Sequence, residues 1–338
     1  MREIHGRRGN VQTMIRLDRR QPKSSGSWPK GAAILSALLL ALGGGSAALA
    51  APFGESFASP EQAVRAIATA WHSGSASELL KILGPDSRQL VMSGDPVAEN
   101  NARRQFAAAY DQRHRIEGGG NGEAILIIGN EDWPYPIPIV RQGDAWRFDV
   151  KAGAEQVLDR RIGKNELNAI AVSRAYVAAQ RDYAAQDPMG DGLHDYAQQV
   201  ASTAGKHDGL YWPVSPGQAE SPLGPLVAKA EAKGYPPPPP TAGGLRPFEG
   251  YYFRILTGQG AHAAGGARDY VVDGHMTGGF ALIAFPAKWG DSGVMTFLVN
   301  QNGIVFEKNL GPDTAVTARQ IKVYDPDRSW RIASPTSP

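Results

Sequence analysis

The chain has 338 residues, enough for two cores of ordinary domain size, and it contains no cysteine. The missing cysteines exclude disulfide bonds, thiolate nucleophiles and every zinc or iron–sulfur site that needs cysteine ligands. The formal net charge is +2, but without residues 1–50 it becomes −4, from 27 basic and 31 acidic residues, so no basic surface is expected for nucleic acid or anionic lipid.

The first 50 residues have the three parts of a secretory signal. The basic residues come first, at Arg2, Arg7, Arg8, Arg16, Arg19, Arg20, Lys23 and Lys30. The apolar run 32–42 is too short to span a bilayer as a helix, and Ala48 and Ala50 have the spacing of a cleavage site. We expect cleavage after Ala50 and a periplasmic protein. An uncleaved inner-membrane anchor and a translation start at Met14 stay open as alternatives.

Three helices are expected in the first part of the remaining chain. Ser59 is placed as an N-cap before Pro60, and Gln62 is placed to complete a capping box. The first helix is predicted to end at Gly74, and further helices are predicted at 76–83 and about 96–114.

The sequence period then changes from that of a helix to that of strands. Three strands are predicted, at 123–128, 137–141 and 145–150, and Gln142-Gly143-Asp144 predicts a tight hairpin turn between the last two. Helices followed by an antiparallel hairpin indicate a small α+β domain at 57–152.

The second half begins with the longest helical pattern, at 165–186. Its apolar stripe consists of Val172, Tyr176, Ala179 and Tyr183. A short helix is predicted at 223–233, and the five prolines at 236–240 predict an extended polyproline strap.

Beyond the prolines the sequence alternates as β-strands do. Five strands are predicted, at 251–256, 279–285, 294–300, 304–308 and 320–323. Asn302-Gly303 predicts a type I′ hairpin turn between the third and fourth of them. A long helix packed on an antiparallel sheet is the arrangement this pattern favours, in a second domain at 165–333. The predicted fold class is therefore α+β.

Several short segments carry a resemblance to a known bacterial family. They are FASPEQA at 57–63, WRFD at 146–149 with KAG at 151–153, the helical segment 176–186, GLYW at 209–212, GYYFRIL at 250–256, and GVMTF at 293–297 leading to Asn302-Gly303. Together they resemble the family catalogued as domain of unknown function 2950 (DUF2950), over about residues 57–333. That family has no assigned activity, so the resemblance implies none.

Two looser resemblances concern the fold. The first predicted domain, 57–152, is similar to the cone-shaped α+β folds of the nuclear-transport-factor-2-like class. The second, 165–333, resembles the headgroup of a pilin or pseudopilin. No apolar half-helix precedes Asn165 as it does in a pilin, so fibre assembly is not expected from this resemblance.

The loop at 191–195 is the candidate metal site. Asp191, His194 and Asp195 supply two carboxylates and an imidazole, which together suit a divalent cation or an acid/base pair. His207 and Asp208 are the nearest additional ligands. A solvated loop of turn-forming residues is the alternative interpretation.

No local motif assigns a catalytic residue or a cofactor. The patterns H-E-x-x-H, G-x-S-x-G and G-x-x-x-x-G-K-[ST] are all missing. We therefore predict no cofactor and leave the catalytic residues unknown.

Six aromatic residues are predicted to bind a ligand: Trp133, Tyr135, Tyr211, Trp212, Tyr251 and Trp289. Flat amphipathic side chains stack on sugar rings or hold a peptide strand, and the prolines beside the first two clusters favour exposed loops. Packing in the core is the alternative interpretation for all six.

Two functions stay open. The first is non-catalytic binding or scaffolding of another envelope protein, or of a cell-wall or polysaccharide component, through an aromatic-lined cleft or a sheet edge. The second is a hydrolase that acts on a cell-wall or polysaccharide substrate with paired carboxylates, which leave no local motif. A cleft with two facing carboxylates about 5 to 10 Å apart would favour the enzyme.

Overall fold

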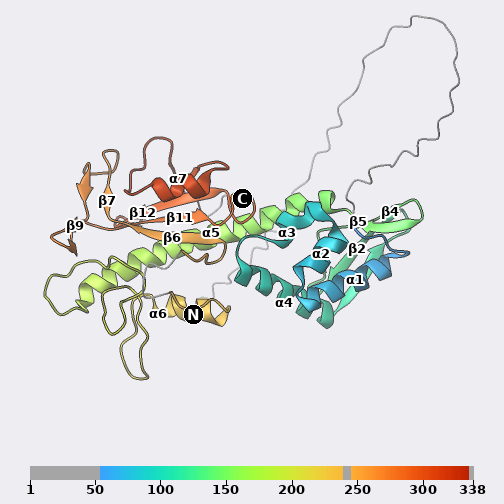
Figure 1. Cartoon of the computed structure of the whole chain (residues 1–338), viewed down its shortest axis with the longest axis horizontal. Coiled ribbons are helices and arrows are strands. Elements are labelled where there is room, and N and C mark those ends of the chain that lie inside the picture. Colours follow the sequence, from blue (N-terminus) through green and yellow to red (C-terminus); the bar gives the residue numbers. More distant parts are fainter. Residues whose placement is uncertain (1–53, 239–244, 335–338) are drawn as a thin grey trace, which may run out of the picture. The chain divides into compact units, whose positions relative to one another are not determined.

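The computed structural model describes residues 54–238 and 245–334 (Figure 1). Helices and antiparallel sheets make up both halves of this part of the chain, which confirms the predicted α+β class. The predicted signal and the cleavage site after Ala50 lie outside the described residues, and so do Pro239 and Pro240 of the predicted strap.

The helices before the first sheet lie close to their predicted positions. They are α1 (Pro60–Ser73), α2 (Ala76–Leu83), the 3-10 turn η1 (Pro85–Ser87), α3 (Arg88–Val91) and α4 (Pro96–Gln112). The Ser59 hydroxyl accepts the N–H of Gln62 at 3.3 Å, as an N-cap does. The Gln62 side chain accepts the N–H of Ala58 instead of that of Ser59, so the predicted capping box is displaced by one residue. Gly74 ends the helix with φ 71°.

The first sheet has five antiparallel strands. They are β1 (His114–Gly118), β2 (Glu123–Ile128), β3 (Trp133–Pro134), β4 (Ile139–Gln142) and β5 (Ala145–Phe148). Their order is β1-β2-β4-β5, and β3 pairs with β2. The predicted hairpin between β4 and β5 is confirmed, with Gly143 at φ 64°. β1 was not predicted, because the helical pattern of α4 was extended to His114, where the strand begins.

The long helix α5 (Val150–Gln186) starts well before the predicted Asn165. Asp149 caps it by accepting the N–H of Ala152 at 3.0 Å. Gly153 lets its first turn approach the chain closely, because a Cβ there would lie 2.5 Å from the carbonyl oxygen of Pro136. The apolar stripe of α5 is weak in this first part, since most of the side chains there are polar or small, and the true start of the helix was therefore not predicted.

Two hydrophobic clusters form the core. One contains residues of α1, α2, α4 and the first sheet, and ends at Val150 on α5. The other begins at Ala169 on the same helix and contains the second sheet. Because α5 runs through both predicted ranges, the division into domains at 57–152 and 165–333 stays a prediction.

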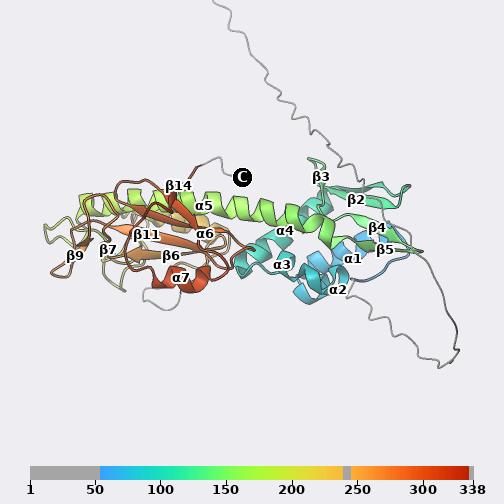
Figure 2. The same ribbon diagram turned by 90° about the horizontal axis from the view of Figure 1, so that it is seen from above.

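The second sheet also has five antiparallel strands. They are β6 (Tyr251–Leu256), β11 (Ala281–Pro286), β12 (Met295–Asn300), β13 (Phe306–Asn309) and β14 (Arg331–Ile332), in the order β14-β13-β12-β11-β6. α5 covers one face, and α7 (Thr314–Gln320) covers part of the other (Figures 1 and 2). The smaller elements are α6 (Gly224–Ala232) and the strand pairs β7–β8 (Gly258–Gln259, Arg268–Asp269) and β9–β10 (Val271–Val272, His275–Met276).

Two predictions in this sheet were wrong. The predicted strand at 320–323 is the end of α7 followed by irregular chain, because the carbonyl oxygens of Ala318 and Ile321 are held by the Arg254 guanidinium and not by a neighbouring strand. The turn after β12 is not type I′. That turn needs positive φ at both central residues, and here Gly303 has φ 77° while Asn302 does not lie in the left-handed region.

Within 54–238 and 245–334, no helix has both the length and the apolar composition needed to cross a membrane.

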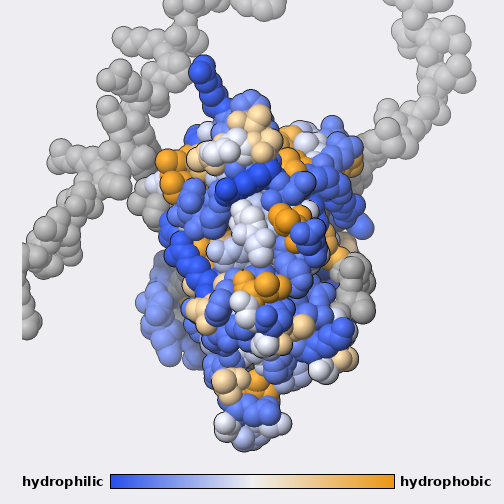
Figure 3. All heavy atoms as spheres, turned by 90° about the vertical axis from the view of Figure 1, so that its left-hand side faces the viewer, coloured by the Kyte–Doolittle hydropathy of each residue, from blue (hydrophilic) through white to orange (hydrophobic). Residues whose placement is uncertain are grey.

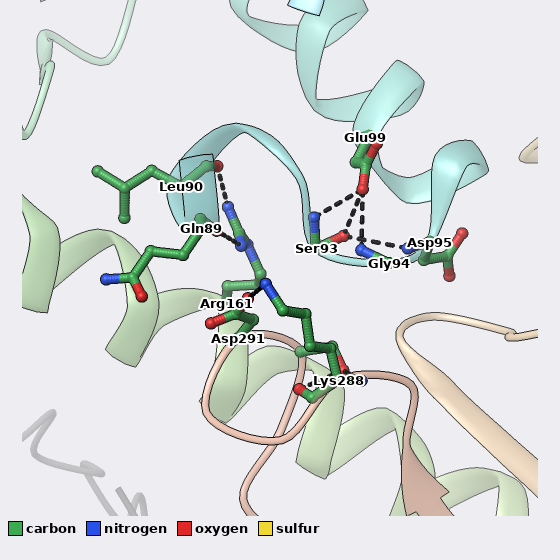
Figure 4. A network of polar contacts seen from close by, with 10 residues as sticks. Gln89, Leu90, Ser93, Gly94, Asp95, Glu99, Arg161, Lys288 and Asp291 are labelled. Atoms are coloured by element: carbon green, nitrogen blue, oxygen red, sulfur yellow. Dashed lines mark hydrogen bonds and ion pairs between the residues drawn. The ribbon is translucent and has the colours of Figure 1, made fainter. Parts of the chain in front are cut away.

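A polar network connects the first third of α5 to its neighbours (Figure 4). Arg161 of α5 donates to the carbonyl oxygens of Gln89, at 2.8 Å, and Leu90. Nearby, the turn after β11 closes with an ion pair between Lys288 and Asp291.

Candidate functional site

The six predicted aromatic residues do not share one exposed surface. Tyr135 and Tyr251 are 6% and 0% exposed and belong to different hydrophobic clusters. Trp133 is 41% exposed on β3, with the Arg160 guanidinium 5.6 Å from the centre of its ring. Core packing therefore accounts for Tyr135 and Tyr251. Of these three residues, Trp133 alone presents a large surface to solvent.

The other three aromatic residues are partly buried. Tyr211 and Trp212 pack against the second cluster, and the Trp212 ring stacks on His207 at 4.3 Å. The Trp289 indole donates to the Asn309 side chain at 2.9 Å. A binding role for these residues stays a prediction.

The residues of the predicted metal loop make separate contacts. Asp191 accepts the N–H of Leu193 at 3.0 Å, and His194 Nδ1 lies 2.9 Å from the carbonyl oxygen of Ala184. Asp195 pairs with His275, 3.1 Å away. In the part of the chain that the structure describes, no three histidine or carboxylate side chains converge as a metal site would require. Asp208 is likewise held by the loop around it, accepting the N–H of Thr203 at 2.7 Å.

Figure 3 shows the face beyond the C-terminal end of α5 and the β9–β10 hairpin. It is mostly hydrophilic, and its hydrophobic residues lie in small separate patches. Three apolar side chains on the elements at this end, Met189, Leu193 and Val272, are each about half exposed. Scattered residues of this kind are normal on a soluble surface and do not define a binding site.

Two open hollows lie on the surface formed by residues 54–238 and 245–334. The first, of about 380 Å³, lies between α1, the end of α4 and β1. It is lined by Glu61, Val64, Arg65, Tyr110, His114, Arg115 and Ile116. The second, of about 450 Å³, lies beside α7 and is called the α7 hollow below. It is lined by Leu298, Lys308, Leu310, Thr317, Gln320, Ile321, Lys322, Val323, Asp325 and Trp330.

The α7 hollow exists because α7 is too short to cover its face of the sheet. Leu298 of β12 lies beneath the hollow and is itself 1% exposed, whereas Lys308 of β13 is partly exposed at its edge. Arg254 fixes the end of the helix by donating to the carbonyl oxygens of Ala318, at 2.9 Å, and Ile321, at 2.5 Å. These are carbonyl groups that a helix end leaves without partners, and a cation is favourable there. The Arg254 guanidinium therefore holds the C-terminal end of α7, while the buried Thr314 and Ala318 pack the helix against the core.

The segment 321–330 forms the opposite wall. Tyr324 is buried and donates its N–H to the carbonyl oxygen of Gly258 at 2.9 Å, which ties the segment to β7. Farther along, the Lys308 ammonium donates to the Ser329 hydroxyl at 2.7 Å and lies 5.8 Å from the centre of the Trp330 ring. The wall thus combines an aromatic ring with a cation that packs over it.

The one carboxylate that lines the α7 hollow is already engaged. Asp325 accepts the backbone N–H of His262 at 2.8 Å, and its other oxygen lies 3.0 Å from His262 Nδ1. The hydrogen bond to Asp325 raises the pKa of His262 above its usual value, with a further contribution from the negative charges of Asp325 and Asp327. The exposed pair attaches segment 321–330 to the loop after β7.

We expect His262 to titrate above pH 6.5 in a pH series of NMR spectra, and Asp325→Asn to lower its pKa. The protonated imidazole is the form that the carboxylate stabilises. The attachment is therefore strongest below the pKa of the unfolded chain and weakens as the pH rises through the folded pKa. Equal His262 pKa values in both proteins would show that the pair does not form in solution.

No sequence motif pointed to the α7 hollow, because its lining comes from β12, β13, α7 and segment 321–330. Among the lining residues, Trp330 is the one whose position in the sequence indicates an aromatic side chain near the surface. It follows the turn formers Asp325-Pro326-Asp327, a context in which a tryptophan is often near the surface.

The described residues form an α+β protein with a surface hollow of mixed apolar and polar lining beside its second sheet. The family model "Protein of unknown function (DUF2950)" matches residues 54–333, so the chain belongs to this family. No curated protein and no solved structure matches the chain. The predicted likenesses to nuclear-transport-factor-2-like folds and to pilin headgroups are accordingly not confirmed.

Proposed function

We propose that the chain is an exported envelope protein that binds or scaffolds a partner protein without catalysing a reaction, and that the α7 hollow is its anchoring site. The observation that carries the proposal is the composition of the hollow. Leu310, Ile321 and Val323 provide a partly exposed apolar lining beside the Trp330 ring, and the hollow opens to solvent. Apolar and aromatic pockets of this kind receive the few side chains that dominate the binding energy of a protein interface.

The open form of the hollow favours a partner protein over a small molecule. Pockets for small ligands bury about 70–90% of the ligand surface, which an open hollow does not do. Two exposed apolar side chains lie close in sequence to lining residues: Val316, next to Thr317, is 60% exposed, and Ile332, two residues after Trp330, is 65% exposed. Such a surface suits an interface that continues past the hollow.

The arrangement gives less support to a hydrolase with paired carboxylates. The first hollow is lined by one carboxylate, Glu61, and the α7 hollow by one, Asp325. Hydrolysis of a glycosidic bond by the usual mechanisms needs two carboxyl groups across the scissile bond. Neither hollow offers that pair.

Export is supported by the N-terminal sequence. Eight basic residues, an apolar run and the Ala48-Leu49-Ala50 site follow each other in the order of a secretory signal. The absence of cysteine means that folding after export would need no disulfide chemistry.

Site-specific photo-crosslinking in cells tests both parts of the proposal. A photoreactive amino acid at Val323, which lines the hollow and is 39% exposed, should give a discrete adduct with a partner protein. Val272 on β9, 50% exposed, is the matched control position and should give no such adduct. The crosslinked chain should be recovered from the periplasm with Ala51 as its first residue. Equal adducts from both positions would contradict the anchoring site, and a cytoplasmic chain that keeps residues 1–50 would contradict export.

A further inference from the structure

The first sheet ends in two outer strands, β1 and β5, and their edges differ. The edge of β5 is covered at Trp146, which exchanges two backbone hydrogen bonds with Phe57, at 2.9 and 2.8 Å. In the part of the chain that the structure describes, β1 pairs with β2 alone. The other edge of β1 is therefore open to a further strand, and a strand edge of this kind is a template for pairing with another chain.

The hydrogen bonds around β1 show which of its backbone groups face outward. Just past the strand, Gly119 donates its N–H to the carbonyl oxygen of Glu123 at 2.5 Å. Bonded and non-bonded pairs alternate along an antiparallel ladder, so Ile116, three positions earlier, does not bond to β2. Its opposite residue Leu126 agrees with this, since the Leu126 carbonyl accepts the N–H of Tyr135 on the far side of β2, at 2.7 Å. The N–H and carbonyl groups of Ile116 therefore point to the outer edge, where no described residue bonds to them.

The side chains of β1 carry opposite charges on either side of an apolar residue. Ile116 packs against the first hydrophobic cluster, so Arg115 and Glu117 lie on the other face of the strand. The Arg115 guanidinium donates to the Glu117 carboxylate at 3.1 Å, as two residues on one face can. In the chain direction the order is cation, apolar residue, anion. An antiparallel copy of this order places each charge opposite its counter-charge.

We propose that β1 pairs with β1 of a second copy of this chain, antiparallel and centred on Ile116, so that the first sheets of two copies form one continuous sheet. Ile116 exchanges two backbone hydrogen bonds with Ile116 of the second copy, which uses the outward groups of both. Arg115 lies opposite Glu117 of the second copy in a non-hydrogen-bonded pair, where Cα atoms are about 4.5 Å apart and side chains approach closely. The two-fold axis repeats this ion pair, so the interface contains it twice. The proposal does not depend on the α7 hollow.

The charge order also selects one register. A slip of two residues in one direction would place Arg115 opposite Arg115 of the second copy, and a slip in the other direction would place Glu117 opposite Glu117. Like charges directly opposite each other destabilise a pair of strands. A slip of one residue would turn the side chains of the second strand to the wrong face. Charges on an edge strand usually prevent pairing, but these two charges permit pairing in the register centred on Ile116.

The space beside β1 can receive a second strand. The first hollow, of about 380 Å³, opens next to β1, and its lining includes His114, Arg115 and Ile116. The His114 ring is held away from the edge, because it stacks on Tyr110 with the ring centres 3.8 Å apart. In the proposed register, the residue opposite His114 is Gly118 of the second copy, which has no side chain to displace this stack.

Charge reversal tests the proposal by analytical ultracentrifugation of the chain from Ala51, which contains every described residue. We expect the unsubstituted chain to sediment as a dimer at about 100 μM. Glu117→Arg places arginine opposite Arg115 in both ion pairs and should raise the dissociation constant at least about tenfold, and Arg115→Glu should do the same with glutamate. When the two variants are mixed in equal amounts, they should form a heterodimer, because each then meets the opposite charge at both positions.

Arg141→Glu is the matched control. Arg141 is an exposed arginine on β4 of the same sheet and, like Arg115, has a carboxylate near it in the sequence, with Asp144 3.8 Å away. Its reversal should leave the dissociation constant of the dimer unchanged. Circular dichroism of each variant, together with the heterodimer itself, shows that the single variants are folded.

Three outcomes would overturn the proposal. An unsubstituted chain that sediments as a monomer at about 100 μM would show that β1 does not pair between copies. A dimer of unchanged strength in both Arg115→Glu and Glu117→Arg would place the contact on another surface. Two single variants that are monomeric alone and stay monomeric when mixed would show that these two residues do not face each other across a two-fold axis.

Discussion

Asp95→Ala should lower the free energy of unfolding by about 3–5 kcal/mol, measured by urea denaturation. Asp95 is 1% exposed, and both of its carboxylate oxygens are used. One accepts the N–H groups of Val97 and Ala98, at 3.1 and 3.0 Å, and so caps α4. The other accepts the hydroxyl of Tyr235 at 2.9 Å and the N–H of Gly250 at 2.8 Å. Alanine would leave two buried donors without partners and remove the cap, which alone is worth about 1 kcal/mol.

Two variants separate the network from a general effect of losing a carboxylate. Tyr235→Phe removes one of the four donors and should cost about 1–2 kcal/mol. Asp86→Ala removes an exposed carboxylate in η1 and should change the free energy of unfolding by less than about 0.5 kcal/mol. A cost of Asp95→Ala as small as that of Asp86→Ala would show that these four hydrogen bonds do not hold the two parts of the chain together.

The importance of Asp95 was invisible in the sequence for a physical reason. An aspartate before a proline and a helix is ordinary N-cap chemistry, and that local role is confirmed. The other half of its hydrogen bonding comes from residues 140 and 155 positions away. The neighbouring turn, in contrast, is held by a local residue, since Glu99 of α4 accepts the N–H groups of Ser93 and Gly94, six and five positions away (Figure 4).

Local signals predicted local structure well. Gly74 and Gly143 were placed at chain reversals, and both have positive φ values there. The boundaries of α2, β2 and β6 agree with the predicted ranges, because each has a strong period and a clear end signal. The segment 320–323 was misread because a short apolar run has the same appearance in a strand and in irregular chain that packs beside a helix.

The candidate site was not predictable in the same way. Its apolar wall uses Leu310 and Val323, which have no distinguishing pattern in the sequence, and its exposure depends on where α7 ends. The aromatic residues that the sequence did single out include Tyr251, which lies at the centre of the core. Aromatic side chains bury large areas in either setting, so residue type alone does not separate a core position from a binding position.

Tyr251 also explains why glycine stands at position 293, and Gly293→Ala should lower the free energy of unfolding by about 3 kcal/mol. A Cβ at position 293 would lie 2.1 Å from the phenol oxygen of Tyr251 and 2.6 Å from its Cζ. The ring is 0% exposed, and its hydroxyl donates to the carbonyl oxygen of Met295 at 2.9 Å, so it has little freedom to move away. Burial also raises the pKa of Tyr251 well above its usual value, which keeps the hydroxyl a neutral donor.

Gly290→Ala is the matched control in the same turn. A Cβ at position 290 would meet no atom within 4 Å, but the residue has φ 78°, where alanine is strained by about 1 kcal/mol. Thermal and urea unfolding of both variants should therefore show the larger loss of unfolding free energy for Gly293→Ala. Gly293 does not have a positive φ, so its backbone conformation alone would suit any residue. If Gly290→Ala lowered the free energy of unfolding more than Gly293→Ala, backbone strain at position 290 would outweigh the steric clash at position 293. The close approach of Gly293 to Tyr251 would then not be the reason for glycine at position 293.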